Sequence, residues 1–139
     1  MKKILLFTLF AVILVSCRGP KGNDGLLSVW KVIEIPVAAS DWQAYRDSEG
    51  LNLYYAVDVP VPEITRDIFL DGLIQCYLYN DGRQIVLPSV RHYQNKFGDY
   101  WTQTIDYEYY VNGISFYVTN SDFAIDPPGN MLFVLQILY

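Results

Sequence analysis

The chain has 139 residues with 15 acidic and 10 basic side chains, a length typical of one domain, and its formal net charge is −5. Apolar residues make up 52% and charged residues 18% of it, so the chain can bury a core and does not have the composition of a disordered protein. The acidic balance predicts no nucleic-acid partner. Two cysteines and one histidine are too few for most metal or thiol chemistry.

The first sixteen residues have the layout of an export signal. Met1-Lys2-Lys3 is cationic, and the following run from Ile4 to Val15 is apolar apart from Thr8. Secretory signals combine a positive start with about 7–15 apolar residues, whereas a bilayer-spanning helix needs about 20. We therefore predict a signal peptide over residues 1–16.

The signal ends in Leu14-Val15-Ser16-Cys17, which resembles the lipobox of bacterial lipoproteins. In that family the signal is cut before the cysteine, which carries fatty acids such as palmitate. The resemblance implies lipidation at Cys17 and attachment to a membrane of the cell envelope, with the outer membrane of a Gram-negative bacterium as the expected place. Two or three acyl chains would anchor the protein firmly. An ordinary signal peptide with a cysteine near its cleavage site is the alternative.

Cys76 has no disulfide partner in the chain if Cys17 is acylated. It lies in the apolar stretch from Leu73 to Leu78, and no cationic residue is close to it in sequence. A reactive thiol needs such a neighbour to lower its pKa. We therefore predict that Cys76 is buried and inert.

Residues 17–27 form the next segment, in which glycine occupies every third position at Gly19, Gly22 and Gly25. This is the period of collagen, but it is far too short for a triple helix, so we interpret residues 17–27 as a flexible tether. Here the chain resembles lipoproteins of Bacteroidetes in which collagen-like triplets, more numerous than here, join the lipidated cysteine to one β-rich domain. The resemblance continues through Ser40-Asp41-Trp42, 59–65, Leu87-Pro88, 101–105 and 116–122. It implies a location and a fold, and no established activity.

Residues 28–139 have the pattern of one β domain. Apolar and polar residues alternate with the period of two that is typical of strands with one face on a core. Strands are predicted over 29–35, 51–59, 73–79, 83–87, 100–110, 114–119 and 131–139. Pro36 is expected to end the first strand and Pro88 the fourth. One helical turn is expected over 65–70, and turns at 80–82, 112–113 and 126–130.

Seven or eight short strands without a long helix predict an all-β fold. We favour a two-sheet antiparallel β-sandwich, of the immunoglobulin-like or jelly-roll-like kind. A closed β-barrel of the lipocalin kind is the alternative. The stretch from Met131 to Tyr139 is apolar on both alternating sets, which predicts a central strand covered on both faces.

Residues that could carry catalysis are scattered. His92 could act as a general base, but the sequence has no nucleophile motif to accompany it. The sequence also contains no phosphate-binding loop motif. Asp106 and Glu108 lie two residues apart on one predicted strand face, and Asp47 and Glu49 lie in a predicted loop. The remaining oxygen ligands, Asn120, Asp122, Asp126 and Asn130, do not have the spacing of a calcium loop. We predict no enzymatic activity, no cofactor and no metal.

Tyrosine is the unusual residue of the sequence, with twelve copies. On the alternating strands Trp101 and Phe116 fall on the predicted core face. The opposite faces carry the tyrosines that we take as a candidate ligand or interface face: Tyr54, Tyr77, Tyr79 and Tyr117. Aromatic rings on an outer face can bind sugars or peptides, although tyrosine also packs well across strands. We therefore predict a non-catalytic binding module with a glycan or protein ligand. A structural or assembly module, whose outer aromatic face contacts another protein, is the alternative.

Overall fold

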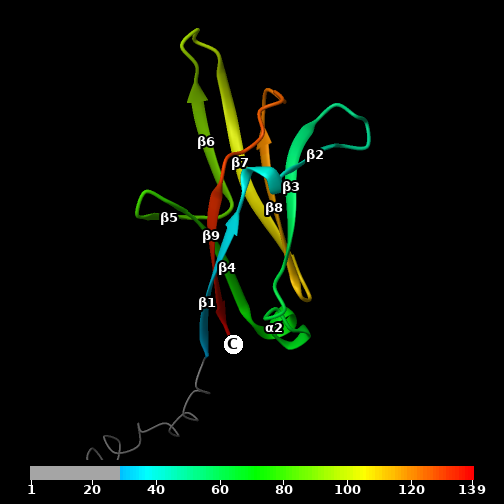
Figure 1. Ribbon diagram of the computed structural model, residues 1–139, viewed down its shortest axis with the longest axis vertical. Helices are drawn as coiled ribbons and strands as arrows, with labels where there is room; N and C mark the ends of the chain where they lie inside the picture. The colour runs from blue at the N-terminus through cyan, green and yellow to red at the C-terminus, as the bar shows by residue number, and fades with distance from the viewer. Residues whose placement is uncertain (1–28) are drawn as a thin grey trace, which may run out of the picture.

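The computed structural model describes residues 29–139. The predicted signal peptide, Cys17 and the tether lie outside these residues. The described chain forms nine strands, a 3-10 turn η1 (Ala39–Asp41) and one short helix α2 (Arg66–Asp71) (Figure 1). The strands are β1 (Trp30–Val37), β2 (Gln43–Arg46), β3 (Leu53–Pro60), β4 (Leu73–Asn80), β5 (Arg83–Val86), β6 (Ser89–Gln94), β7 (Tyr100–Tyr110), β8 (Gly113–Asn120) and β9 (Met131–Leu138).

The strands form two antiparallel sheets that face each other. One sheet has four strands in the order β1-β9-β4-β5, and the other has five in the order β2-β3-β8-β7-β6. Neither sheet closes into a barrel, so the predicted β-sandwich is confirmed and the barrel alternative is wrong. Figure 1 shows the four-stranded sheet beside the five-stranded sheet, with α2 at the end of the sandwich where the chain terminates.

The core lies between the sheets. Phe116 of β8 and Phe133 of β9 stack across it with ring centroids 3.8 Å apart, and both are fully buried. Trp42 closes one side, with its ring edge on Phe133 and its indole N–H donated to the carbonyl of Gly129 at 3.2 Å. Burial of such side chains contributes roughly 1.5–3 kcal/mol each and holds the two sheets together.

Strand β9 is central, as predicted, with β1 and β4 as its neighbours. Its inward residues Phe133, Leu135 and Ile137 are fully buried. On its other face Val134 is buried, as predicted, but Leu132 and Leu138 remain half-buried on the outer surface, so the predicted cover of this face is incomplete in the described residues. The apolar alternate residues of β9 therefore belong to an outer apolar surface.

Local signals placed the turns well. Asp81 and Gly82 have φ of 48° and 73° between β4 and β5, and Asn112 has φ of 68° between β7 and β8. Asn, Asp and Gly adopt this left-handed backbone at low cost. Helix α2 begins after Thr65, whose hydroxyl accepts a hydrogen bond from the Ile68 N–H at 3.3 Å. These elements were expected from the sequence.

Two edge features differ from the prediction. Strand β1 continues through Pro36 to Val37, because an edge strand has a side on which a missing N–H costs nothing. Strands β2 and β6 were not predicted. Both are short edge strands, β2 is exposed throughout and β6 nearly so, and therefore neither shows an apolar alternation.

The hairpin of β6 and β7 extends beyond the end of the four-stranded sheet, and we call this part the β6–β7 arm (Figure 1). Trp101 lies on the core-facing side of β7, as predicted, but no strand of the other sheet reaches it, so it is half-buried. It stacks instead on Tyr93 of β6, with ring centroids 5.4 Å apart. The expectation that Trp101 is a core residue like Phe116 is therefore wrong.

Candidate functional site

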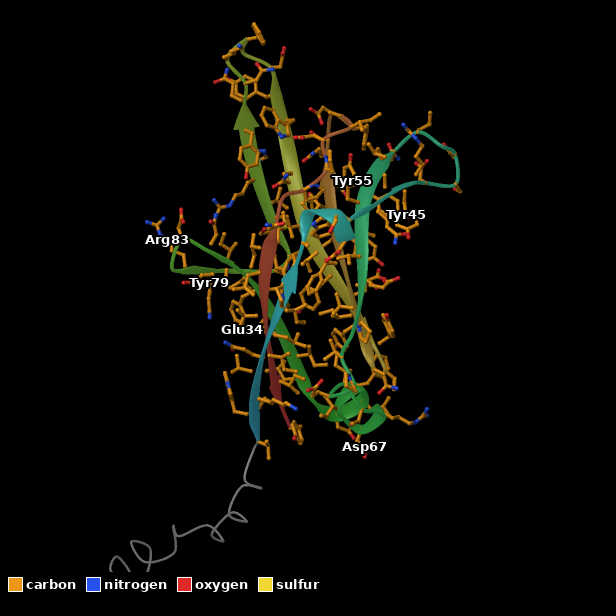
Figure 2. The ribbon with its side chains drawn as sticks, viewed as in Figure 1. Glu34, Tyr45, Tyr55, Asp67, Tyr79 and Arg83 are labelled. Atoms are coloured by element: carbon orange, nitrogen blue, oxygen red, sulfur yellow. The ribbon has the colours of Figure 1, made fainter. Side chains whose placement is uncertain are left out.

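The four candidate tyrosines do not form one surface. Tyr54 of β3 and Tyr117 of β8 lie on the outer face of the five-stranded sheet, whereas Tyr77 and Tyr79 of β4 lie on the outer face of the four-stranded sheet. Figure 2 shows Tyr45, which neighbours Tyr54, and Tyr79 on opposite sides of the molecule. The reason is that the direction away from the core is opposite on the two sheets of a sandwich. The single candidate face is therefore corrected to two.

Three rings form a continuous row on the five-stranded sheet. Tyr45 stacks on Tyr54, with centroids 5.7 Å apart and an interplanar angle of 20°, and Tyr54 meets Tyr117 at 6.2 Å. We call Tyr45, Tyr54 and Tyr117 the tyrosine row. The sequence missed Tyr45 because β2 carries no apolar alternation, although its Gln-Ala-Tyr-Arg sequence is compatible with an edge strand. Stacked rings on a sheet are rigid and present both apolar faces and hydroxyl groups.

Three carboxylates lie on the same face as the tyrosine row. Asp106 of β7 is paired in register with Tyr117, and Asp58 and Glu108 are paired with Ser115 from its two sides. The Ser115 hydroxyl donates to Asp58 at 2.5 Å, and the Tyr117 hydroxyl donates to Glu108 at 3.3 Å. We call Asp58, Asp106 and Glu108 the acidic trio. Hydrogen bonds therefore hold two of its three members beside the ring of Tyr117.

The negative charges of Asp106 and Glu108 destabilise each other on this face. Partial burial and the nearby charge of Glu108 raise the pKa of Asp106 above its usual value of 3.8. Burial also raises the pKa of Tyr117, so its hydroxyl stays protonated and remains a donor to Glu108. A carboxylate with a raised pKa is poorly stabilised in its charged form, so a new hydrogen-bond donor would stabilise it. The face therefore offers acceptors to hydroxyl or ammonium groups of a ligand.

A hollow adjoins the tyrosine row at the open edge of β3. Strand β2 pairs with β3 only as far as Ala56, so the edge of β3 from Val57 to Pro60 stays open beside η1. The hollow has a volume of about 540 Å³. Its polar lining comes from Ser40, Asp41, Gln43, Tyr45 and Asp58. Tyr45 and Asp58 thus belong to the hollow and to the aromatic and acidic face at once.

Other residues that the sequence singled out have structural roles. Asp47 accepts hydrogen bonds from the backbone N–H of Leu51 at 2.8 Å and from the side chain of Asn52, and the first of these bonds chiefly lowers its pKa. It closes the loop between β2 and β3. His92 is exposed on β6 and its Nδ1 lies 2.9 Å from the Thr102 hydroxyl.

Cys76 is fully buried on the inner face of β4, and burial raises the pKa of its thiol to about 12. Three of the four residues considered for calcium accept hydrogen bonds within the chain: Asn120 from Gln103, Asn130 from the Ala39 N–H and Asp122 from the Ala124 N–H. Within residues 29–139, no group of three His, Cys, Asp or Glu side chains is placed to bind a metal.

The outer face of the four-stranded sheet is a second candidate surface, and we call it the apolar face. Its exposed side chains come from every strand of that sheet: Trp30 and Val32 of β1, Leu73 and Tyr79 of β4, and Val86 of β5, with Leu132 and Leu138 of β9 between them. Glu34 is its charged residue. Exposed apolar patches of this kind often mark contacts with other proteins.

The chain shows no match to a protein-family model, to a curated protein or to a solved structure. Within residues 29–139, no helix has the length and apolar character that crossing a membrane requires.

Proposed function

We propose that this protein is a non-catalytic, lipid-anchored binding module of the cell envelope, and that it holds a glycan on the tyrosine row. The observation that carries the proposal is the juxtaposition of a row of three neighbouring rings with hydrogen-bonding carboxylates on one sheet face. The anchoring part depends on the lipobox at Cys17.

A glycan fits this face for two physical reasons. The apolar C–H face of a sugar ring packs on an aromatic ring, and the rigid rings of Tyr45 and Tyr54 lose little entropy on binding. Sugar hydroxyls are donors, and Asp58 and Asp106 are acceptors beside the rings. Sugar hydroxyls would also relieve the repulsion between Asp106 and Glu108.

The full-length lipidated chain in detergent micelles, screened on an array of neutral oligosaccharides, tests the proposal. Binding should fall about tenfold or more for Tyr54→Ala, since a central aromatic anchor contributes at least about 1.4 kcal/mol. Tyr79→Ala is the matched control, because it removes a tyrosine from the opposite sheet. Absence of any glycan ligand, or equal effects of the two variants, would refute the glycan site.

The same screen separates binding from catalysis. Two carboxylates, one of which has a raised pKa, are also the arrangement that glycoside hydrolases use. Any bound oligosaccharide should therefore be recovered intact after long incubation. Release of shorter sugars, lost in Asp106→Asn, would replace the binding module with a hydrolase.

The anchor is tested separately. Cys17→Ser should move the protein from the membrane fraction to the soluble fraction and abolish incorporation of labelled palmitate. If the variant still sediments with membranes and the wild-type chain takes up no fatty acid, the anchoring proposal is wrong.

The apolar face supports a second candidate function, assembly with another copy of this chain. The chain carries net negative charge, yet this face has Glu34 as its charged residue, so two copies would repel each other least there. Light scattering should then report a dimer, which Leu73→Lys converts to a monomer. A monomer at all concentrations would leave no role for this face in self-assembly.

A further inference from the structure

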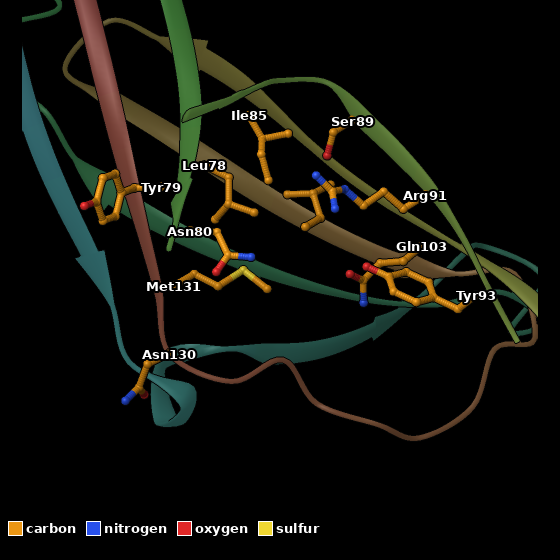
Figure 3. Close-up of a pocket in the computed structure, with 11 residues that line it drawn as sticks. Leu78, Tyr79, Asn80, Ile85, Ser89, Arg91, Tyr93, Gln103, Asn130 and Met131 are labelled. Atoms are coloured by element: carbon orange, nitrogen blue, oxygen red, sulfur yellow. The ribbon is translucent and has the colours of Figure 1, made fainter. Parts of the chain in front are cut away.

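A second, smaller pocket lies between the two sheets. It is found where the four-stranded sheet ends and the β6–β7 arm continues, at the end of the molecule away from Trp30 (Figures 1 and 3). Its volume is about 220 Å³. Its apolar lining consists of Leu78, Ile85, Ile105 and Met131. It shares no residue with the tyrosine row or the acidic trio.

Arg91 is the charged residue of this pocket, and no carboxylate lines it. Figure 3 shows its side chain reaching from β6 toward Leu78 and Ile85. Within residues 29–139 its guanidinium forms no ion pair and no hydrogen bond. Arg91 is exposed, so its guanidinium lies over the apolar wall in contact with water and without a partner from the described residues. A ligand with an anionic group would supply the missing partner.

Polar neighbours of Arg91 are held in place. Gln103 lies directly opposite it on β7, and its amide donates to Asn120 at 3.2 Å. Tyr93 stacks on Trp101 at 5.4 Å and an angle of 20°. The fixed amide leaves its carbonyl oxygen as an acceptor, and the Ser89 hydroxyl can donate and accept. Fixed groups of this kind reduce the entropy lost on binding.

We propose that this pocket binds one acidic sugar residue, a six-membered ring that carries a carboxylate. The planar fork of Arg91 pairs with the carboxylate in a bidentate manner. Ser89 and Gln103 pair with ring hydroxyls, and the apolar wall packs against the ring. The carboxyl terminus of a peptide would use Arg91 but would leave these hydroxyl partners unused. The inference is independent of the glycan site on the tyrosine row.

Titration calorimetry of the full-length chain tests this pocket with four probes: glucuronate, glucose, inorganic phosphate and N-acetyl-tyrosine. Glucuronate should bind, and its affinity should fall as salt is added. Arg91→Gln should weaken glucuronate binding about tenfold or more, because it removes a charge-assisted hydrogen bond. Arg91→Lys should weaken it less, since the charge remains and the fork is lost. Tyr54→Ala should leave it unchanged, which separates this pocket from the tyrosine row.

Several results would overturn the proposal. They are no glucuronate binding at millimolar concentration, equal binding of glucose, or an Arg91→Gln variant that binds as well as the wild type. Equal affinity for phosphate would identify a general anion site, and preference for N-acetyl-tyrosine would identify a peptide carboxyl terminus. Unchanged thermal unfolding of Arg91→Gln, which is expected for an exposed residue, shows that any lost affinity comes from the site.

Discussion

Two buried tyrosine hydroxyls should respond in opposite ways to removal. Strand β5 pairs with residues 77–80 of β4, and beyond them the Leu87 N–H donates to the Cys76 carbonyl at 3.1 Å, so the Cys76 N–H and the Ile74 carbonyl have no strand partner on that edge. The hydroxyl of Tyr107 reaches across from β7 to take that place. It accepts from the Cys76 N–H at 3.3 Å and donates to the Ile74 carbonyl at 3.5 Å. The hydroxyl of Tyr55 is buried and has no hydrogen-bond partner.

The magnitudes follow from these contacts. Tyr107→Phe strands a backbone N–H in the core, which costs about 1–3 kcal/mol, and the length of the two bonds places the expected loss at about 1–2 kcal/mol. Tyr55→Phe removes a buried polar group without breaking a bond. Its stability should be unchanged or higher by up to about 1 kcal/mol. Both substitutions keep the ring, so packing changes little.

Urea unfolding followed by tryptophan fluorescence measures both variants against the wild type. The slope of the free energy of unfolding with urea should stay constant, so that the midpoint reports stability. Equal destabilisation by the two substitutions would refute the reasoning, as would a larger loss for Tyr55→Phe. Either result would mean that burial of the hydroxyl group, and not the hydrogen bonds of Tyr107 to β4, governs the free energy of unfolding.

Three further predictions concern the charge of Asp106, the thiol of Cys76 and the burial of three aromatic side chains. Because the folded pKa of Asp106 is raised, its charge destabilises the fold above its usual pKa of 3.8; Asp106→Asn should therefore raise the urea midpoint at neutral pH, and the gain should vanish as pH falls below 3.8. Cys76, fully buried with a pKa raised to about 12, should resist a thiol reagent in the folded chain and react in urea, and rapid native labelling would contradict its burial. Phe116→Ala should cost about 3–5 kcal/mol, whereas Tyr79→Ala and Trp101→Ala should cost clearly less, and equal midpoints for the three variants would contradict their different burial.

The alternation of apolar residues determined most of the strands and their inward faces from sequence alone. Cys76 and Phe116 were placed toward the core because a strand turns successive side chains to opposite faces, which is a property of a few neighbouring residues. The helical turn at α2 and the turns at Asp81-Gly82 and Asn112 also depend on local chemistry. These sequence patterns predict strands and turns without any knowledge of what each strand packs against.

Pairing between distant strands decided the rest. Edge strands β2 and β6 bury too little on either face to leave an alternation, so Tyr45 and Arg91 entered no predicted surface. The two outer directions of the sandwich separate Tyr54 and Tyr117 from Tyr77 and Tyr79, a division that depends on which sheet each strand joins. Tyr54 meets Tyr117 through the register of β3 with β8, and the pairing of β4 with β9 brings Leu78 and Met131 to the pocket at Arg91; these strands are far apart in the chain, and only the tertiary structure fixes their registers.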